Sequence, residues 1–316
     1  MKQSIPSKND VEYTFKKVQS FVHRTPVLTS TLLNEISGAT IYFKCENFQK
    51  TGSFKMRGAV NAIQNLSTKQ KERGVVTHSS GNFAQAIALA AKNIGIKAYI
   101  VMPSTVTKIK REAVKKYGGI ITISKPTLAS RQVAANKIAK ETGATFLHPS
   151  NNTDVILGQG TAAIELLEEH PMLDIILVPV GGGGLLAGTA LAATYFGTKC
   201  KVIAGEPLEA DDAYRSMLSG KIEDNVSAKT IADGLRTTLG NFNFPIIKEY
   251  VSEIIRVDEP EIIKAMQLIW ERMNIVIEPS SAVPFAALLK NKEYFKNKKI
   301  GIILSGGNVD LSNLPF

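Results

Sequence analysis

Short apolar runs alternate with longer amphipathic runs along most of the chain. The apolar runs predict strands at residues 40–45, 74–78, 97–102, 119–124, 175–180, 201–206 and 299–304. The amphipathic runs predict helices at residues 54–66, 82–94, 108–117, 128–141, 158–169, 185–195 and 260–273. This alternation is typical of parallel sheets covered by helices, so we expect an α/β fold.

One stretch without charged residues, 175–198, is long enough to cross a membrane. It contains Pro179 and a four-glycine loop, Gly181, Gly182, Gly183 and Gly184. Proline and consecutive glycines break the interior of a helix. We therefore expect a buried strand, a loop and a helix here, and no membrane partner.

The chain of 316 residues is basic, with a formal net charge of +10. Its basic residues are scattered, apart from a short cluster at Lys108, Lys110 and Arg111. No basic stripe interleaved with aromatic residues is visible, so we expect the charge to attract small anions and not nucleic acid.

Cys45 and Cys200 are isolated in the sequence, which argues against a disulfide framework and a cysteine zinc site. Residues 1–13 are polar and show no apolar signal segment. A reducing cytoplasm is the compartment that we expect.

The first motif with chemical content is Ser53-Phe54-Lys55. Ser53 is a good N-cap, which would place Lys55 in the first turn of a helix. The positive end of the helix dipole and burial would both lower the pKa of this lysine and make its amine a better nucleophile. The alternative is an ordinary solvated lysine.

The four-glycine loop follows a predicted strand and precedes a predicted helix. Glycines let backbone N–H groups approach an anion, and the helix end adds partial positive charge, so this arrangement is typical of a phosphate site. No Lys-Ser/Thr pair follows, so the loop is not a Walker loop. The alternative is a tight turn that needs small residues.

A third loop, Ser79-Ser80-Gly81-Asn82, also joins a predicted strand to a helix. Its backbone amides could hold a carboxylate, the Asn82 side chain could form a hydrogen bond with a cofactor, and Ser80 could transfer a proton. The alternative is ordinary helix capping.

Two further segments carry weaker signals. The run from Ser305 to Asn308 follows a strand and could face a ligand, although such loops are common. Glu206, Asp211 and Asp212 offer oxygen ligands for a hard cation such as Mg²⁺ or Ca²⁺. Their alternative is a set of solvated acids in a loop.

Taken in this order, the four loop motifs resemble those of fold-type II pyridoxal-phosphate (PLP) enzymes, in particular serine racemase and the serine/threonine dehydratases. The resemblance runs from about Thr25 to Leu311. It implies two interwoven three-layer α/β domains with twisted, mostly parallel sheets, as in the tryptophan synthase β-like fold. Residues 1–70 and 150–316 would form a large PLP-binding domain, and residues 71–149 a small one. Members are typically homodimers, so we expect a homodimer.

The resemblance also implies roles for individual residues. Lys55 would hold PLP as a Schiff base and move the α-proton, and Phe54 would lie beside the ring. Asn82 would hydrogen-bond the phenolic oxygen, and the four-glycine loop would hold the phosphate. A neutral Ser305 at the pyridine nitrogen would weaken the electron sink and favour prompt loss of a β-substituent.

For the substrate, the resemblance places the carboxylate on the backbone of Ser79, Ser80, Gly81 and Asn82, with Arg131 on the substrate side. Ser80 would be a second acid/base on the face opposite Lys55. A divalent-cation site for Mg²⁺, Ca²⁺ or Mn²⁺ would use the residues Glu206, Ala210 and Asp212, with Ala210 contributing its carbonyl oxygen.

We therefore expect a dehydratase (ammonia-lyase) that converts L-serine- or L-threonine-type amino acids to 2-oxo acids and ammonia, with some racemase activity. The alternatives are a serine or aspartate racemase, a 3-hydroxyaspartate dehydratase, and a silent PLP-fold binding protein, which an intact Lys55 argues against. The chain departs from the family at Phe83, where histidine is usual, and at Ser150, where animal racemases have asparagine. Both departures leave the substrate open. The chain stops soon after Leu311, so we expect no C-terminal regulatory domain.

Overall fold

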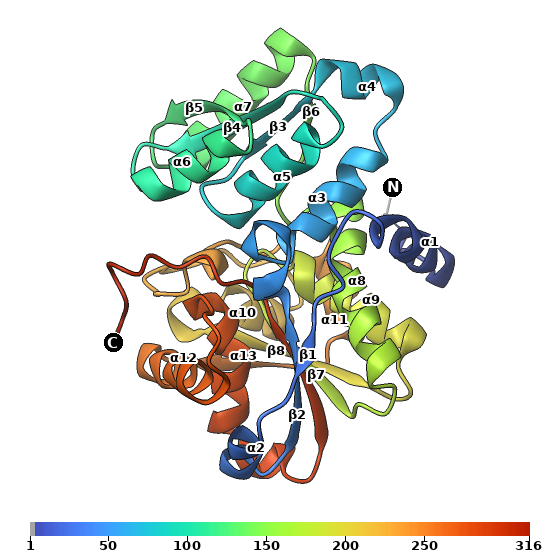
Figure 1. Ribbon diagram of the computed structural model, residues 1–316, viewed down its shortest axis with the longest axis vertical. Coiled ribbons are helices and arrows are strands. Elements are labelled where there is room, and N and C mark those ends of the chain that lie inside the picture. The colour runs from blue at the N-terminus through green and yellow to red at the C-terminus, as the bar shows by residue number, and fades with distance from the viewer. Residues whose placement is uncertain (1–3) are drawn as a thin grey trace.

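The computed structural model describes residues 4–316, and within them the strands form a larger and a smaller sheet (Figure 1). The larger sheet has the order β1-β2-β10-β7-β8-β9, and the smaller sheet has the order β5-β4-β3-β6. Strand β1 pairs antiparallel with β2, and the other pairs are parallel. The strands are β1 (Val27–Leu28), β2 (Thr40–Cys45), β3 (Val75–His78), β4 (Ala98–Pro103), β5 (Ile120–Ser124), β6 (Thr145–Phe146), β7 (Ile175–Pro179), β8 (Lys201–Pro207), β9 (Glu253–Val257) and β10 (Lys299–Leu304).

Helices cover both sheets, with α5, α6 and α7 beside the smaller one in Figure 1. The helices are α1 (Lys8–Val18), α2 (Thr31–Ser37), α3 (Lys55–Gln64), α4 (Thr68–Arg73), α5 (Asn82–Lys92), α6 (Lys108–Lys116), α7 (Leu128–Thr142), α8 (Thr153–Glu169), α9 (Gly184–Phe196), α10 (Asp212–Ser219), α11 (Phe244–Tyr250), α12 (Glu259–Met273), α13 (Pro279–Lys290) and α14 (Lys292–Phe295). The fold is thus α/β with mostly parallel sheets, as predicted.

Strand β7 shows why the larger sheet needs a helical layer on each face. Its side chains alternate between two hydrophobic cores: Ile176 and Val178 pack with residues of α8 and α9, whereas Ile175 and Leu177 pack with residues of α12 and α13. Side chains of successive strand residues point to opposite faces, so a strand that is apolar throughout needs cover on both sides.

The uncharged stretch forms the predicted strand, loop and helix: β7, then glycines, then α9. No helix among residues 4–316 is long and apolar enough to cross a membrane. The sequence pattern missed β1 and β6, which have two residues each, and β9, which carries charged residues. It also missed α13, because this helix contains Pro279 and Pro284.

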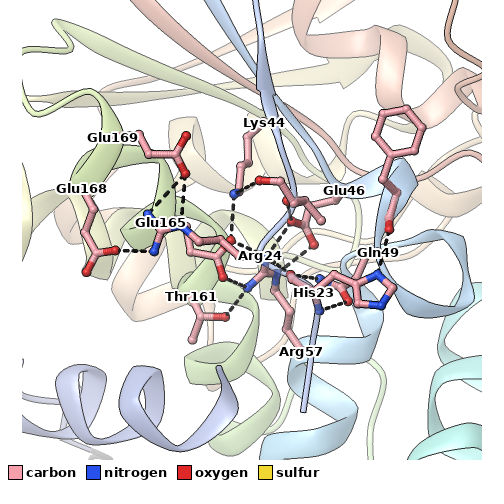
Figure 2. Close-up of polar contacts among 12 residues, drawn as sticks. His23, Arg24, Lys44, Glu46, Gln49, Arg57, Thr161, Glu165, Glu168 and Glu169 are labelled. Atoms are coloured by element: carbon pink, nitrogen blue, oxygen red, sulfur yellow. Dashed lines mark hydrogen bonds and ion pairs between the residues drawn. The ribbon is translucent and has the colours of Figure 1, made fainter. Parts of the chain in front are cut away.

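A buried ionic cluster joins the start of α3 to β2 and α8 (Figure 2). Arg57 donates to both oxygens of Glu46 and both oxygens of Glu165, each at 2.8 Å. Lys44 lies 2.7 Å from Glu165, and all four side chains are at most 2% exposed. Two cations balance two anions, so the burial is compensated, and the arginine fixes the helix that begins at Lys55.

Candidate active site

A cleft of about 540 Å³ lies where loops of both sheets meet. Its volume is in the range of small-molecule sites. The predicted cofactor- and substrate-site residues all line it: Phe54, Lys55, Ser79, Ser80, Gly81, Asn82, Arg131, Gly181, Gly182, Gly183, Gly184 and Ser305. The fold therefore gathers residues from four separate loops and from α7 at one cavity.

Lys55 is the first residue of α3, and its amine is in an apolar setting. The Nζ atom lies 4.9 Å from the ring centre of Phe54 and 5.7 Å from that of Phe83. It donates a 2.9 Å hydrogen bond to the carbonyl oxygen of Pro149. Burial lowers the pKa of Lys55 to about 8, and the negative charge of Glu278 opposes the shift. The amine of Lys55 is therefore not freely solvated, which goes against the alternative of an ordinary surface lysine.

Ser53 is not the N-cap that the sequence predicts. The helix begins after Phe54 without a side-chain cap, and the Ser53 hydroxyl has no hydrogen-bond partner within residues 4–316. Ser53 instead forms an antiparallel bridge with Gly306. Tertiary pairing with the end of β10 thus replaces a local cap.

The four-glycine loop surrounds the N-terminus of α9, and Gly183 adopts φ +78° at its cap. A Cβ atom at Gly182 would lie 2.4 Å from Ser150 Oγ, and one at Gly183 would lie 2.7 Å from Asn243 Oδ1. Neither Gly182 nor Gly183 could carry a side chain without a steric clash. The backbone amides at the N-terminus of α9 are therefore left uncovered beside the cleft. This cradle fits the phosphate group of PLP.

The loop before α5 also leads into a helix N-terminus. Gly81 occupies the cap position without a side-chain cap, so the capping alternative for this loop is wrong. The Asn82 Nδ2 group donates to both oxygens of Glu278, at 2.9 and 3.1 Å, and Asn82 Oδ1 accepts from Asn308 at 2.9 Å. These contacts fix the orientation of the Asn82 amide at the rim of the cleft.

Glu278 is a site residue that the sequence did not reveal. It is 4% exposed and lines the cleft, and burial together with the charge of Asp233 raises its pKa to about 7. The sequence signal for it is slight: an acidic residue directly before a proline that opens a helix. Nothing local indicates that it contacts Asn82.

Ser305 follows β10 and is 2% exposed. Its carbonyl oxygen accepts the N–H of Phe54 at 3.0 Å, and its hydroxyl lies 3.0 Å from that of Ser281. A neutral hydroxyl is thereby held beside the loop that carries Lys55. This donor or acceptor fits the pyridine nitrogen of PLP.

Arg131 projects from α7 to the cleft without a carboxylate partner among the described residues. Its Nε atom is buried and unpaired, and burial lowers its pKa. Nearby in the cleft lining, His148 Nδ1 accepts the N–H groups of Ser150 and Asn151, and burial lowers the pKa of this imidazole to about 4. The histidine that feels the charge of Arg131 is His78, whose pKa is lowered by burial and by this guanidinium.

Phe83 and Ser150, the two positions at which the sequence resemblance led us to expect other residues, both line the cleft. Phe83 is 1% exposed and packs in the core between α3 and α5. Ser150 touches the four-glycine loop. Both are therefore placed to shape the cavity.

The predicted cation residues lie outside the cleft lining. Glu206 accepts the N–H groups of Ala213 and Tyr214, both at 2.8 Å, which ties it to the start of α10. Asp212 Oδ2 accepts from Leu239, whereas Asp212 Oδ1 is buried without a partner within residues 4–316.

Burial raises the pKa of both acids: that of Asp212 to about 7, and that of Glu206 well above its usual value with a contribution from the Asp212 charge. Two buried carboxylates with an unpaired oxygen fit a cation. In the described part of the chain, no cluster of three or more His, Cys, Asp or Glu side chains could hold one, so such a site would need the Ala210 carbonyl oxygen or water. Asp211 does not join it, because it pairs with Arg215 and Arg256.

Comparison with known proteins defines the class of this molecule. Residues 18–306 match the family model described as pyridoxal-phosphate dependent enzyme. The chain belongs to this family, and its architecture is that of fold-type II PLP enzymes.

Individual relatives indicate which kind of PLP-dependent enzyme the chain resembles. The chain is 50% identical to serine racemase of Dictyostelium discoideum over 311 residues, covering 96% of this chain and 95% of the relative. It is 46% identical to beta-hydroxyaspartate dehydratase of Paracoccus denitrificans, covering 99% of each. The crystal structure of the T.th. threonine deaminase superposes with a TM-score of 0.92 at 39% identity, covering 98% of this chain and all of that one. The protein is a PLP-dependent enzyme of the serine racemase and dehydratase type.

Proposed function

We propose that the enzyme is an ammonia-lyase for small hydroxylated L-amino acids such as serine and threonine, with some racemase activity. The observation that carries this proposal is the pairing of a buried amine, Lys55, with an uncharged Ser305 held beside its loop. A neutral partner for the cofactor ring limits how long negative charge can rest there, which favours departure of a β-hydroxyl group.

The lining of the cleft supports the cofactor-holding roles that we propose. The four-glycine loop would take the phosphate, Asn82 and Ser305 would take polar atoms of the ring, and Phe54 would pack beside it. When bound to Lys55, PLP supplies an electron-withdrawing ring that stabilises negative charge at the substrate α-carbon.

The other steps belong to the side chains. Backbone amides of the loop from Ser79 to Asn82 bind the substrate carboxylate at the N-terminus of α5, with Arg131 on the substrate side. The Lys55 amine takes the α-proton on one face, which its lowered pKa allows near neutral pH. Ser80 holds a proton at the other face. The β-hydroxyl then leaves as water with the proton that Lys55 removed, and hydrolysis of the remaining enamine gives a 2-oxo acid and ammonia.

We further propose that Glu206, the Ala210 carbonyl and Asp212 bind Mg²⁺, Ca²⁺ or Mn²⁺ in a structural role. The unpaired Asp212 oxygen supports this, since a cation would satisfy it and offset the charge of both acids.

The domain and subunit organisation completes the proposal. The smaller sheet falls within residues 71–149 and the larger one in residues 1–70 and 150–316, which supports treating these as two domains with the active site at their junction. We propose that two copies form a homodimer, which light scattering on a sizing column tests directly.

A second candidate activity is dehydration of 3-hydroxyaspartate. Arg131 has no carboxylate partner in the described structure, so a substrate with a second carboxylate would pair with it. The relative from Paracoccus denitrificans, a beta-hydroxyaspartate dehydratase, agrees with this candidate. Racemisation of serine or aspartate is the remaining alternative.

One panel assay tests these activities together. The purified enzyme is incubated with L- and D-serine, L-threonine, L-aspartate and the isomers of 3-hydroxyaspartate, and both oxo-acid formation and enantiomer composition are measured. Dominant L-serine or L-threonine elimination supports the proposal. Turnover confined to 3-hydroxyaspartate, or racemisation without elimination, contradicts it, and a protein without visible PLP absorbance or turnover would be a silent binding protein.

A variant of Arg131 distinguishes 3-hydroxyaspartate from serine as the substrate. Arg131→Met should lower kcat/KM for 3-hydroxyaspartate by about 100-fold or more if a charged pair is lost, with a small effect on serine. Lys140→Met is the matched control, because it removes an exposed cation from the same helix. Equal losses for both substrates would assign Arg131 to general substrate binding.

A further inference from the structure

Ser281 lies directly behind Ser305, and neither the sequence motifs nor the proposed function uses it. It belongs to the first turn of α13 and is fully buried. The hydroxyl oxygens of the two serines are 3.0 Å apart. Ser305 lines the cleft whereas Ser281 does not, so Ser281 can act on a bound group only through Ser305.

The backbone of Gly306 clamps the Ser281 hydroxyl. The Gly306 N–H donates to Ser281 Oγ at 2.8 Å, and Ser281 Oγ donates to the Gly306 carbonyl oxygen at 2.7 Å. A serine hydroxyl carries one proton. Because that proton points at Gly306, the proton between the two serines comes from Ser305, which then offers only lone pairs to the cleft.

A second arrangement requires only two hydroxyl rotations. The Gly306 carbonyl also accepts the N–H of Glu278 at 3.0 Å, so it keeps a hydrogen bond when Ser281 turns its proton toward Ser305. Ser305 can then donate its own proton into the cleft. The resulting chain runs in one direction, from the Gly306 N–H through Ser281 to Ser305, and successive donors in such a chain polarise one another.

We propose that Ser281 is a positioning residue that makes Ser305 a hydrogen-bond donor toward the ring nitrogen of PLP. The inference rests on the proposed placement of Ser305 at that nitrogen. A neutral donor stabilises the unprotonated nitrogen and so keeps the ring a moderate electron sink, which favours β-elimination. Without Ser281, the Ser305 hydroxyl loses the donor that strengthens and orients it.

The test measures the hydrogen bonding of the PLP ring nitrogen directly and does not depend on turnover. Wild type, Ser281→Ala and Ser280→Ala are loaded with PLP that carries nitrogen-15 in the ring, and the nitrogen resonance is measured by solid-state NMR. Ser280 is the control for direct effects on the cleft, because it is a buried neighbour that itself lines the cleft but whose hydroxyl accepts from Gly234 and has no contact with Ser305 among the described hydrogen bonds. We expect Ser281→Ala to move the resonance to higher frequency, toward a pyridine nitrogen without a hydrogen bond, and Ser280→Ala to match wild type. A protonated nitrogen in wild type, or no shift in Ser281→Ala, overturns the proposal.

Two more variants keep the test decisive. Ser281→Cys replaces the hydroxyl with a weaker donor and should give an intermediate shift; a resonance identical to wild type overturns the proposal even if the alanine variant does not fold. Ser305→Ala tests the underlying placement. No shift in Ser305→Ala means that Ser305 does not face the nitrogen and the inference fails with it, whereas a shift there without one in Ser281→Ala defeats the Ser281 role alone.

Discussion

The backbone N–H of Phe54 donates a 3.0 Å hydrogen bond to the carbonyl oxygen of Ser305. This bond joins the loop before Lys55 to the loop after the last strand, and the Gly307 N–H supports it with a 2.9 Å bond to Gly52. The amine and the neutral hydroxyl of the proposed active site are thereby placed by one short stretch of paired backbone.

Replacing Lys55 tests the proposed attachment of the cofactor. Lys55→Ala should abolish turnover and the visible absorbance of lysine-bound PLP, while Lys69→Ala, an exposed lysine on α4, should resemble wild type. Absorption spectra and borohydride reduction followed by peptide mapping provide the measurement. PLP reduced onto a different lysine of the mutant would contradict the assignment.

The pKa of Lys55 predicts how cofactor binding depends on pH. The neutral amine is the nucleophile, and burial lowers its pKa from 10.5 to about 8. The rate at which PLP reconstitutes the apoprotein should therefore rise with pH and level off above about 8. Stopped-flow absorbance across this range is the measurement, and a rate still rising steeply beyond pH 9 would show that the amine is not desolvated.

Ser80 separates racemisation from elimination. Racemisation needs an acid/base on each face of the substrate, whereas elimination from an L-amino acid needs only Lys55. Ser80→Ala should lower D-serine formation and D-serine elimination by about 100-fold or more, because general acid–base groups contribute on that scale. Elimination from L-serine should largely survive and serves as the internal control. Equal losses would make Ser80 a general binding residue.

Removal of divalent cations tests the Glu206–Ala210–Asp212 site. A cation bound only by the folded protein stabilises it, so exhaustive chelation should lower the melting temperature and activity together, and Mg²⁺ should restore both. Asp212→Asn should lose this response, whereas Glu209→Gln, an exposed acid next to the site, should keep it. An unchanged melting curve after chelation would contradict the proposal that these residues bind a cation.

The buried ionic cluster predicts a large stability effect at Arg57. Arg57→Met leaves two buried carboxylates facing Lys44 alone, which should cost about 3–5 kcal/mol in the free energy of unfolding. Adding Glu46→Gln restores charge balance and should recover much of that loss, as a denaturant double-mutant cycle would show. Additive losses in the double variant would mean that packing, and not charge balance, is responsible.

The local pattern predicted much of the fold. Strands β2 and β10 and the helices that begin at Asn82, Lys108 and Leu128 start where the apolar periodicity places them. The periodicity also identified β7 and α9 on either side of the four-glycine loop. These elements can be predicted from the sequence because each is specified by its own residues, through an apolar run, a turn or an amphipathic face.

The sequence by itself determined which loops carry reactive residues, because glycines, serines and a lysine at strand ends are visible in the chain. The tertiary structure decided what those residues touch. Strand β10 enters the sheet between β2 and β7, which brings Gly306 to Ser53 and Ser305 to Phe54 and displaces the predicted Ser53 cap. Hydrogen bonds between residues distant in the chain, such as that of Ser281 with Ser305, depend on strand order and on packing. The local periodicity of the sequence predicts neither the strand order nor the packing.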